Sequence, residues 1–307
     1  MDLYYSPDGL DLIFDINFNQ PIDNIEFNNN IKTIQFGIKF NQPIEHIKFP
    51  NTLRTLIFGF SFNQPLEKLQ LPNDLNLIDF GTNYNKPLEQ IKFPDNLEHI
   101  MLSRNFNQLI EQIKLPPNLR SIEFGDYFNR SIELIKFPSN IMSIKFGHLF
   151  NKPIEQLKLP DTVQSITFGK HFNKPITNLK FPTNLKTMTF GYYFDQVLTN
   201  LPNTITILTI HNTNHIYEAS NIKNICYVYD EDNKDDDYYY YTIINLPNII
   251  TEVQINHLEY KNDVMTNLPS SIKKIKIIDY YTMILDRFKR IPHGCIITDS
   301  NDNIIRI

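Results

Sequence analysis

Apolar and polar positions repeat along this chain with a period of 22 residues. Residues 40–61 contain two similar apolar patterns, IEHIKF at 44–49 and LRTLIF at 53–58. Each pattern ends with two apolar residues that flank one polar or variable residue, which is typical of a half-buried strand. We therefore expect two short strands in each repeat. A fixed period of this length predicts a solenoid, in which each coil contacts only its neighbours.

An aromatic residue followed by asparagine marks nearly every repeat, as in Phe40-Asn41 and Phe62-Asn63. We expect the rings to stack in a file inside the coils, offset or edge-on. A side-chain amide repeated in every coil can bond to turn backbone groups and to its copies in the next coils. This predicts a structural role for Asn41, Asn63, Asn85, Asn107, Asn129, Asn151 and Asn173.

Glycine follows the second apolar pattern of most repeats, and seven of the nine glycines lie there. Only Ser103 interrupts this column. Glycine at such a fixed place predicts either a positive φ or an approach of backbone too close for a Cβ. A structural role follows for Gly59, Gly81, Gly125, Gly147 and Gly169. Pro50 and its counterparts follow the first pattern, where we expect strand pairing to stop because proline has no N–H.

The repeats divide the chain into four segments. Residues 1–17 are predicted to cap the N-terminal end and residues 18–200 to form the regular coils. Residues 201–278 keep a degenerate form of the pattern, with an acidic insertion near 230–241. The simplest interpretation of this insertion is a solvated loop. Residues 279–307 show no repeat and are predicted to form the C-terminal cap.

Composition narrows the classes of partner and compartment. The formal charge of −5 offers no basic stripe, so we expect no nucleic-acid partner. No apolar run is long enough to span a bilayer, so we expect no membrane association. Cys226 and Cys295 are too few for a disulfide framework, which favours a reducing compartment. The expected location is intracellular and cytoplasmic.

Motifs for catalysis and cofactors are missing from the sequence. It contains no phosphate-binding glycine loop and no nucleophile elbow, and His211 and His215 stand in a loop context without a neighbouring glutamate. Cys226 stands between apolar residues and is interpreted as a buried strand residue. We expect no enzyme activity, metal or cofactor. The alternative is a carbohydrate-active β-solenoid enzyme, for which Asp79 and Glu123 would have to converge.

Variation among the repeats suggests where a partner binds. The outward column of the second pattern and the two residues after each glycine differ from coil to coil, whereas the inward positions repeat. Unselected surface positions would also drift in this way. Because exposed aromatic residues and arginine are common binding anchors, we predict a partner-binding face. Its candidate residues are Phe60, Met101, Arg104, Glu123, Tyr127, Lys145, His148, His171, Tyr192 and Tyr193.

The motif Phe-Asn-Gln-Pro-Ile/Leu, followed by Ile-x-x-Ile-x-Phe-Pro, resembles the FNIP repeat of social amoebae and large DNA viruses. The match covers roughly residues 18–210 and is also similar to the treponemal class of leucine-rich repeats. The resemblance implies a mainly β, leucine-rich-repeat-like solenoid, elongated and capable of curvature, that binds an unidentified protein partner. Many relatives carry an F-box before the repeats, which makes a ubiquitin-ligase adaptor that contacts ligase components the alternative. The residues before Phe18 lack such a module.

Overall fold

The structure is a computed structural model that describes residues 3–199, 201–211, 219, 222, 224–229, 249–255, 268–278, 285, 288 and 290–306. The acidic insertion near 230–241 and His215 lie outside the described residues. The chain forms two compact units, Met1–Leu185 and Lys186–Ile307, and each is considered by itself.

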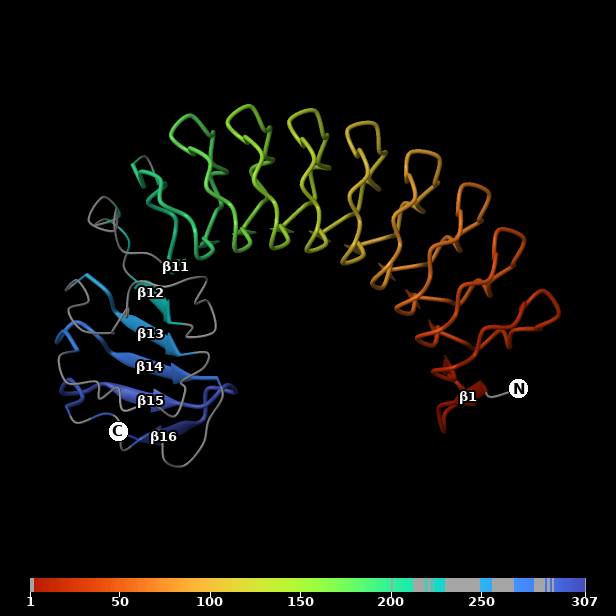
Figure 1. The fold of residues 1–307 in the computed structure, drawn as a ribbon, viewed down its shortest axis with the longest axis horizontal. Coiled ribbons are helices and arrows are strands. Elements are labelled where there is room, and N and C mark those ends of the chain that lie inside the picture. Colours follow the sequence, from red (N-terminus) through yellow and green to blue (C-terminus); the bar gives the residue numbers. More distant parts are fainter. Residues whose placement is uncertain are drawn as a thin grey trace, which may run out of the picture. The chain divides into compact units, whose positions relative to one another are not determined.

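The first unit is a stack of similar coils, visible in Figure 1 as a curved row of loops. Parallel strands β2 to β9 pair in chain order, and facing residues such as Thr33 and Thr55 are one 22-residue repeat apart. The antiparallel strand β1 pairs with β2. The mainly β solenoid predicted from the period is therefore confirmed. Its strands are β1 Leu3–Tyr5, β2 Asp11–Phe14, β3 Thr33–Gln35, β4 Thr55–Ile57, β5 Leu77–Asp79, β6 His99–Met101, β7 Ser121–Glu123, β8 Ser143–Lys145 and β9 Ser165–Thr167.

Each described coil of the first unit contains one strand, so the expectation of two strands per coil is wrong. The pattern at 44–49 instead begins with a tight turn, in which the Ile47 N–H donates to the Ile44 carbonyl at 3.0 Å. This turn buries both isoleucines although they are three residues apart. The following proline is the acceptor of a second turn, because the Leu53 N–H donates to the Pro50 carbonyl at 3.0 Å.

Two files of phenylalanine rings fill the coils. One file follows the strand and includes Phe36 and Phe58, whose centroids are 5.7 Å apart. The other includes Phe40 and Phe62, which stack at 6.1 Å with an interplanar angle of 3°. The files touch within each coil, as Phe58 and Phe62 do at 4.2 Å. All four rings are almost completely buried, and each buried phenylalanine contributes roughly 1.5–3 kcal/mol to folding.

Both ring columns change at one place in the first unit. Tyr84 replaces phenylalanine in the file of Phe40 and Phe62. In the next coil, Leu102 replaces phenylalanine in the file of Phe36 and Phe58. Both side chains are buried. Ser103, the residue that interrupts the glycine column, is also buried, and its hydroxyl donates to the Tyr84 carbonyl oxygen. The Ser103 hydroxyl is thus hydrogen-bonded inside the stack, whereas the buried Tyr84 hydroxyl has no hydrogen-bond partner among the described residues.

The second unit continues the same construction (Figure 1). Strands β10 to β15 are parallel neighbours, and β15 pairs antiparallel with β16. The turn after proline recurs here, since the Ile272 N–H donates to the Pro269 carbonyl and the Cys295 N–H to the Pro292 carbonyl. A further parallel strand therefore lies within the segment predicted as the C-terminal cap. The strands are β10 Thr187–Thr189, β11 Ile207–Ile210, β12 Asn224–Tyr229, β13 Glu252–Ile255, β14 Lys274–Ile277, β15 Ile296–Thr298 and β16 Ile304–Arg306.

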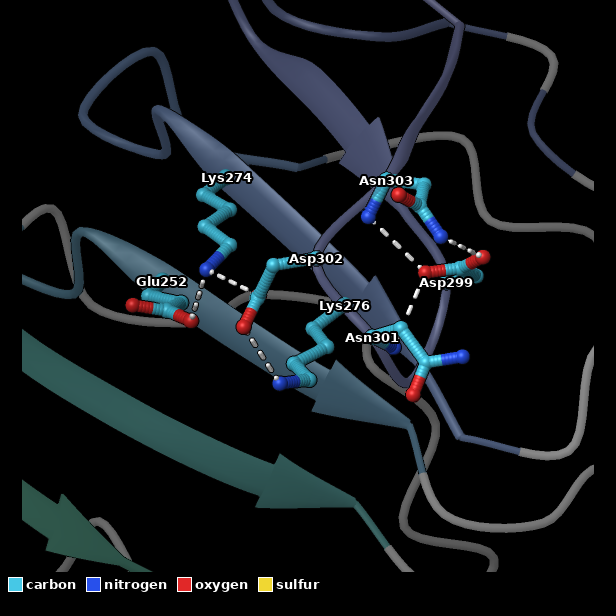
Figure 2. A network of polar contacts seen from close by, with 7 residues as sticks. All are labelled: Glu252, Lys274, Lys276, Asp299, Asn301, Asp302 and Asn303. Carbon is cyan, nitrogen blue, oxygen red and sulfur yellow. Dashed lines mark hydrogen bonds and ion pairs between the residues drawn. The ribbon is translucent and has the colours of Figure 1, made fainter.

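A polar network fastens the turn between β15 and β16 to the sheet of the second unit (Figure 2). Asp299 Oδ1 accepts the N–H groups of Asn301 and Asn303, both at 2.9 Å. Asp302 adopts a φ of 64° and points back over β14. There its two oxygens accept from Lys274 Nζ at 2.7 Å and Lys276 Nζ at 2.9 Å. These contacts link the last hairpin to the parallel strands.

Candidate partner-binding face

Two hydrogen-bonded ladders build the outward face of the first unit. We define this outward face as the outward strand positions together with the two loop residues after each glycine position. The strands form the first ladder. In the second, the N–H of the second loop residue donates to the carbonyl of the first loop residue in the preceding coil, as Ser61 does to Ile38 at 2.9 Å and Tyr127 to Arg104 at 2.9 Å. Because the main chain makes these bonds, the loop side chains can vary without loss of the loop structure.

The close approach of successive coils explains the glycine column. A Cβ on Gly59 would lie 1.9 Å from the Gly37 carbonyl oxygen, and one on Gly125 would lie 1.7 Å from that of Ser103. Gly147 and Gly169 would meet the preceding carbonyl oxygen at 2.0 and 2.1 Å. Gly81 differs because its φ of +68° itself favours glycine.

The asparagine column lies beside the outward face and links the coils. Asn41 Oδ1 accepts the main-chain N–H of Asn63 at 2.9 Å, one coil further on. Glutamine adds a second link where it follows asparagine, since Gln64 Nε2 donates to Asn41 Oδ1 at 3.0 Å. The same Oδ1 to N–H bond joins all successive pairs among Asn19, Asn41, Asn63, Asn85, Asn107, Asn129, Asn151 and Asn173.

The structure places most of the predicted binding residues on this outward face. Met101, Glu123 and Lys145 are the third residues of consecutive strands and therefore form one column. The loop residues beside them are Phe60, Arg104, Tyr127, His148 and His171, of which only His171 is half-buried and the others are exposed. Tyr192 and Tyr193 belong to the second unit, where their rings meet edge-on at 5.0 Å.

Several charges on the outward face are paired with one another. Asp126, which was not among the predicted binding residues, lies close to two residues that were, Arg104 and His148. Its carboxylate lies 3.0 Å from Arg104 Nε and 3.8 Å from His148 Nδ1. Lys145 Nζ lies 3.0 Å from Glu123 Oε2. Exposed pairs of this kind contribute about 0–1 kcal/mol, so a partner could exchange them for its own charges at little cost.

The carboxyl of Asp79 on this face has a raised pKa. It lies in one strand column between the apolar neighbours Ile57 and Met101. Burial raises its pKa, and the charge of Glu123 adds to this effect, whereas a hydrogen bond from the Gly81 N–H at 2.8 Å opposes it. Met101 stands between Asp79 and Glu123 in the column, so the two carboxylates do not face each other directly.

The thiols and potential metal ligands show little sign of reactivity. Cys226 and Cys295 are free and buried, and burial raises their pKa values to about 12 and about 11. Such thiols stay protonated at neutral pH and are poor nucleophiles. Among the residues that the structure describes, no group of three His, Cys, Asp or Glu side chains could hold a metal ion.

The described part of the chain also contains no helix with the length and apolar character that crossing a bilayer requires.

The fold and the repeated columns define a leucine-rich-repeat-like solenoid of the kind that typically serves in protein interactions. The family model described as FNIP Repeat matches residues 18–61, 62–105, 84–127, 106–149, 128–171 and 172–213. These matches together span well over half of the 307 residues. The chain therefore belongs to the FNIP-repeat family.

Solved structures share the leucine-rich-repeat-like fold. The chain is similar to CroV588, described as a novel circular leucine-rich-repeat protein, with 25% identity over 93% of this chain and 49% of that chain and a TM-score of 0.52. It thus spans about half the length of CroV588. An internalin (InlF) from Listeria monocytogenes shares the fold at 12% identity, over 94% of this chain and 79% of that chain, with a TM-score of 0.50. No curated protein matches the sequence.

Proposed function

We propose that this chain is a non-catalytic scaffold that binds a protein partner through the outward face of its first unit. The observation that carries the proposal is the contrast between the two sides of each strand. Inward positions hold the same residue types in successive coils, as Ile122, Ile144 and Ile166 do. The outward neighbours Glu123 and Lys145 differ in charge, although the same ladder holds them.

The chemistry of the outward face suits a protein partner better than a small molecule. Its strands and loops present exposed aromatic and arginine side chains, such as Phe60, Tyr127 and Arg104, along successive coils. These residue types supply much of the binding energy in protein interfaces. Main-chain hydrogen bonds already hold the loops, so less conformational entropy is lost when a partner binds.

We also propose an intracellular setting for this interaction. Both cysteines are free and buried, and the solenoid is held by ring stacking and main-chain bonds. Such a fold does not depend on an oxidising compartment. Localisation of the tagged full chain in its native cell tests this point, and a purely extracellular signal would contradict it.

The proposed function is tested by affinity purification from the native cell with three forms of the full chain. The face variant combines Arg104→Ala, Tyr127→Ala and His171→Ala, and the control variant combines Gln90→Ala, Gln112→Ala and Lys136→Ala at exposed positions of the first apolar segment. Quantitative mass spectrometry should find proteins that wild type and control retain and that the face variant loses. Thermal unfolding should be the same for all three forms.

The opposite pattern, in which only the control variant loses its partners, would contradict the proposed face. Ubiquitin-ligase subunits among the face-dependent proteins would extend the function to a substrate-recognition adaptor.

A further inference from the structure

A cluster of exposed apolar side chains lies on the first coils of the outward face. We call it the N-terminal apolar patch and define it as Tyr4, Ile13, Ile16, Ile38 and Phe60. Their exposed fractions are 56%, 42%, 53%, 47% and 50%. Apolar side chains gathered in this way on a surface commonly mark an interaction site.

The register of the ladders places these residues in two neighbouring groups of the outward face, one on the first strands and one in the loops that follow the strands. Tyr4 faces Ile13 across the antiparallel pair of β1 and β2, so both side chains lie on the same side of the sheet. The Lys39 N–H donates to the Ile16 carbonyl at 3.0 Å, and the Ser61 N–H donates to the Ile38 carbonyl at 2.9 Å. The equivalent loop residues Ile16, Ile38 and Phe60 therefore stand one above another, about 5 Å apart per coil.

The apolar run ends after three coils. The next residues in the same loop column are Thr82, Arg104, Asp126 and His148, all of them polar or charged. The change falls where Gly81 adopts its positive φ. The first three coils therefore differ in surface chemistry from the coils that follow, although the backbone construction is the same.

Two lysines flank the patch on opposite sides. Lys32 precedes β3, and Lys39 follows Ile38 in the loop; both side chains are exposed. Neither is in an ion pair with another described residue, whereas Arg104 and Lys145 further along the face are paired. Asp8 is the exposed carboxylate on the turn before β2, and it already accepts from the Ser6 hydroxyl at 2.6 Å and the Leu10 N–H at 3.1 Å. These hydrogen bonds lower the pKa of Asp8, and the charge of Lys32 contributes to the same effect, although the two side chains form no ion pair. Lys32 and Lys39 therefore remain available for carboxylates of a partner.

We propose that the N-terminal apolar patch docks a peptide segment of a protein partner, with apolar residues at its centre and Asp or Glu on both sides. The apolar centre covers Ile38 and Phe60, and the acidic flanks meet Lys32 and Lys39. This inference rests on the proposed function and adds the chemistry of the bound segment and the coils that bind it.

The test is a selection from a random 12-residue peptide library displayed on phage, with the immobilised full chain as target and the Ile38→Ser/Phe60→Ser double variant as counter-selection. Enriched peptides should share an apolar centre with acidic flanks. Fluorescence anisotropy with a synthetic peptide of the enriched sequence should show at least about tenfold weaker binding to the Lys32→Glu/Lys39→Glu variant, because two attractive charges become repulsive. Leu134→Ser, which alters an exposed leucine elsewhere, should bind like wild type.

Four outcomes would overturn the proposal. The selection could yield no peptide that depends on the patch, or peptides without acidic flanks. Sedimentation could show a dimer that the double serine variant dissociates, which would make a second copy the occupant. Vesicles of phosphatidylcholine and phosphatidylserine could bind wild type but not that variant, which would make a lipid surface the occupant. The affinity purification with the Arg104/Tyr127/His171 variant tests the proposed function independently of the peptide selection. A failure of the peptide proposal is therefore distinguishable from a failure of the proposed function.

Discussion

The Oδ1 atom of Asn85 accepts a hydrogen bond from the main-chain N–H of Asn107 in the next coil, at a distance of 2.9 Å. The two residues occupy the same place in consecutive repeats, so each amide completes the hydrogen bonding of the coil that follows it. Since solenoid stability is approximately a sum of coil and interface contributions, repeated links of this type add along the stack.

Replacement of one amide should therefore weaken the stack measurably. Asn85→Ala leaves the Asn107 N–H without its acceptor, which we expect to lower the free energy of unfolding by about 1–3 kcal/mol. Asn85→Asp keeps an acceptor oxygen and should cost less. Urea denaturation measures both, with Asn73→Ala as an exposed control. Equal midpoints for Asn85→Ala and the control would show that the amide links carry little stability.

The ring files should be the largest local source of stability. Phe128 is fully buried between Phe106 at 6.2 Å and Phe150 at 6.1 Å. Phe128→Ala removes a ring that two coils share, and we expect a loss of about 3–5 kcal/mol. Phe60→Ala alters an exposed ring and should change the denaturation midpoint little. A similar loss for both variants would contradict the division between core file and outward face.

The glycine column should tolerate no side chain. A Cβ on Gly147 would lie 2.0 Å from the Gly125 carbonyl oxygen, so Gly147→Ala forces the coils apart and should cost about 3 kcal/mol or more. Gly9→Ala is the control, because no atom lies within 4 Å and only its φ of +70° is unfavourable. We expect about 1 kcal/mol there. A larger loss for Gly9→Ala than for Gly147→Ala in chemical denaturation would contradict the close approach.

The asparagine, phenylalanine and glycine columns could be predicted from the sequence, because each coil imposes the same steric demand at the same place. The turn at 44–49 was harder to predict. Its alternation covers only three residues, so Ile47 and Phe49 fit a strand as well as a turn that buries Ile44 beside Ile47. Cys295 repeats a place that isoleucine holds in the preceding coil, and this change concealed the coil in residues 279–307.

The surface was predicted less completely than the core. The 22-residue spacing alone was enough to predict that Arg104 and Tyr127 lie on the outward face. The ion pair of Arg104 with Asp126 depends on side-chain geometry between coils, which no spacing rule reveals. Ile16 was assigned to a cap, so its alignment with Ile38 became visible only through the hydrogen bonds between successive loops.

The stability of the first unit should respond to the charge of Asp79. Burial raises the pKa of this carboxyl in the folded state, so the folded protein binds the proton more tightly than the unfolded chain. Stability contributed by this group then falls as pH rises from the unfolded pKa through the folded one. Asp79→Asn should therefore raise the melting temperature at pH 7 relative to wild type, and the difference should shrink on acidification. A difference that grows on acidification would contradict this sign.

The C-terminal hairpin should show the opposite dependence. Hydrogen bonds from Lys274 and Lys276 lower the pKa of Asp302. The stability that this carboxylate contributes is therefore present above its unfolded pKa and is lost as pH falls through the lower folded value. Asp302→Asn keeps a residue that tolerates a positive φ but removes the charge, so amide exchange of β15 and β16 should accelerate at pH 7. Equal exchange at pH 7 would show that the lysine contacts do not hold the hairpin.

The outward face itself is tested most directly by photo-crosslinking in the native cell. A benzoylphenylalanine placed at Tyr127 or at Phe60 reports on this face, and the same residue at Leu134 reports on an exposed position of the first apolar segment. We predict a crosslinked partner protein from Tyr127 and Phe60 and none from Leu134. Crosslinks from Leu134 alone, or of equal yield from all three positions, would contradict a partner-binding role for the strand-and-loop face.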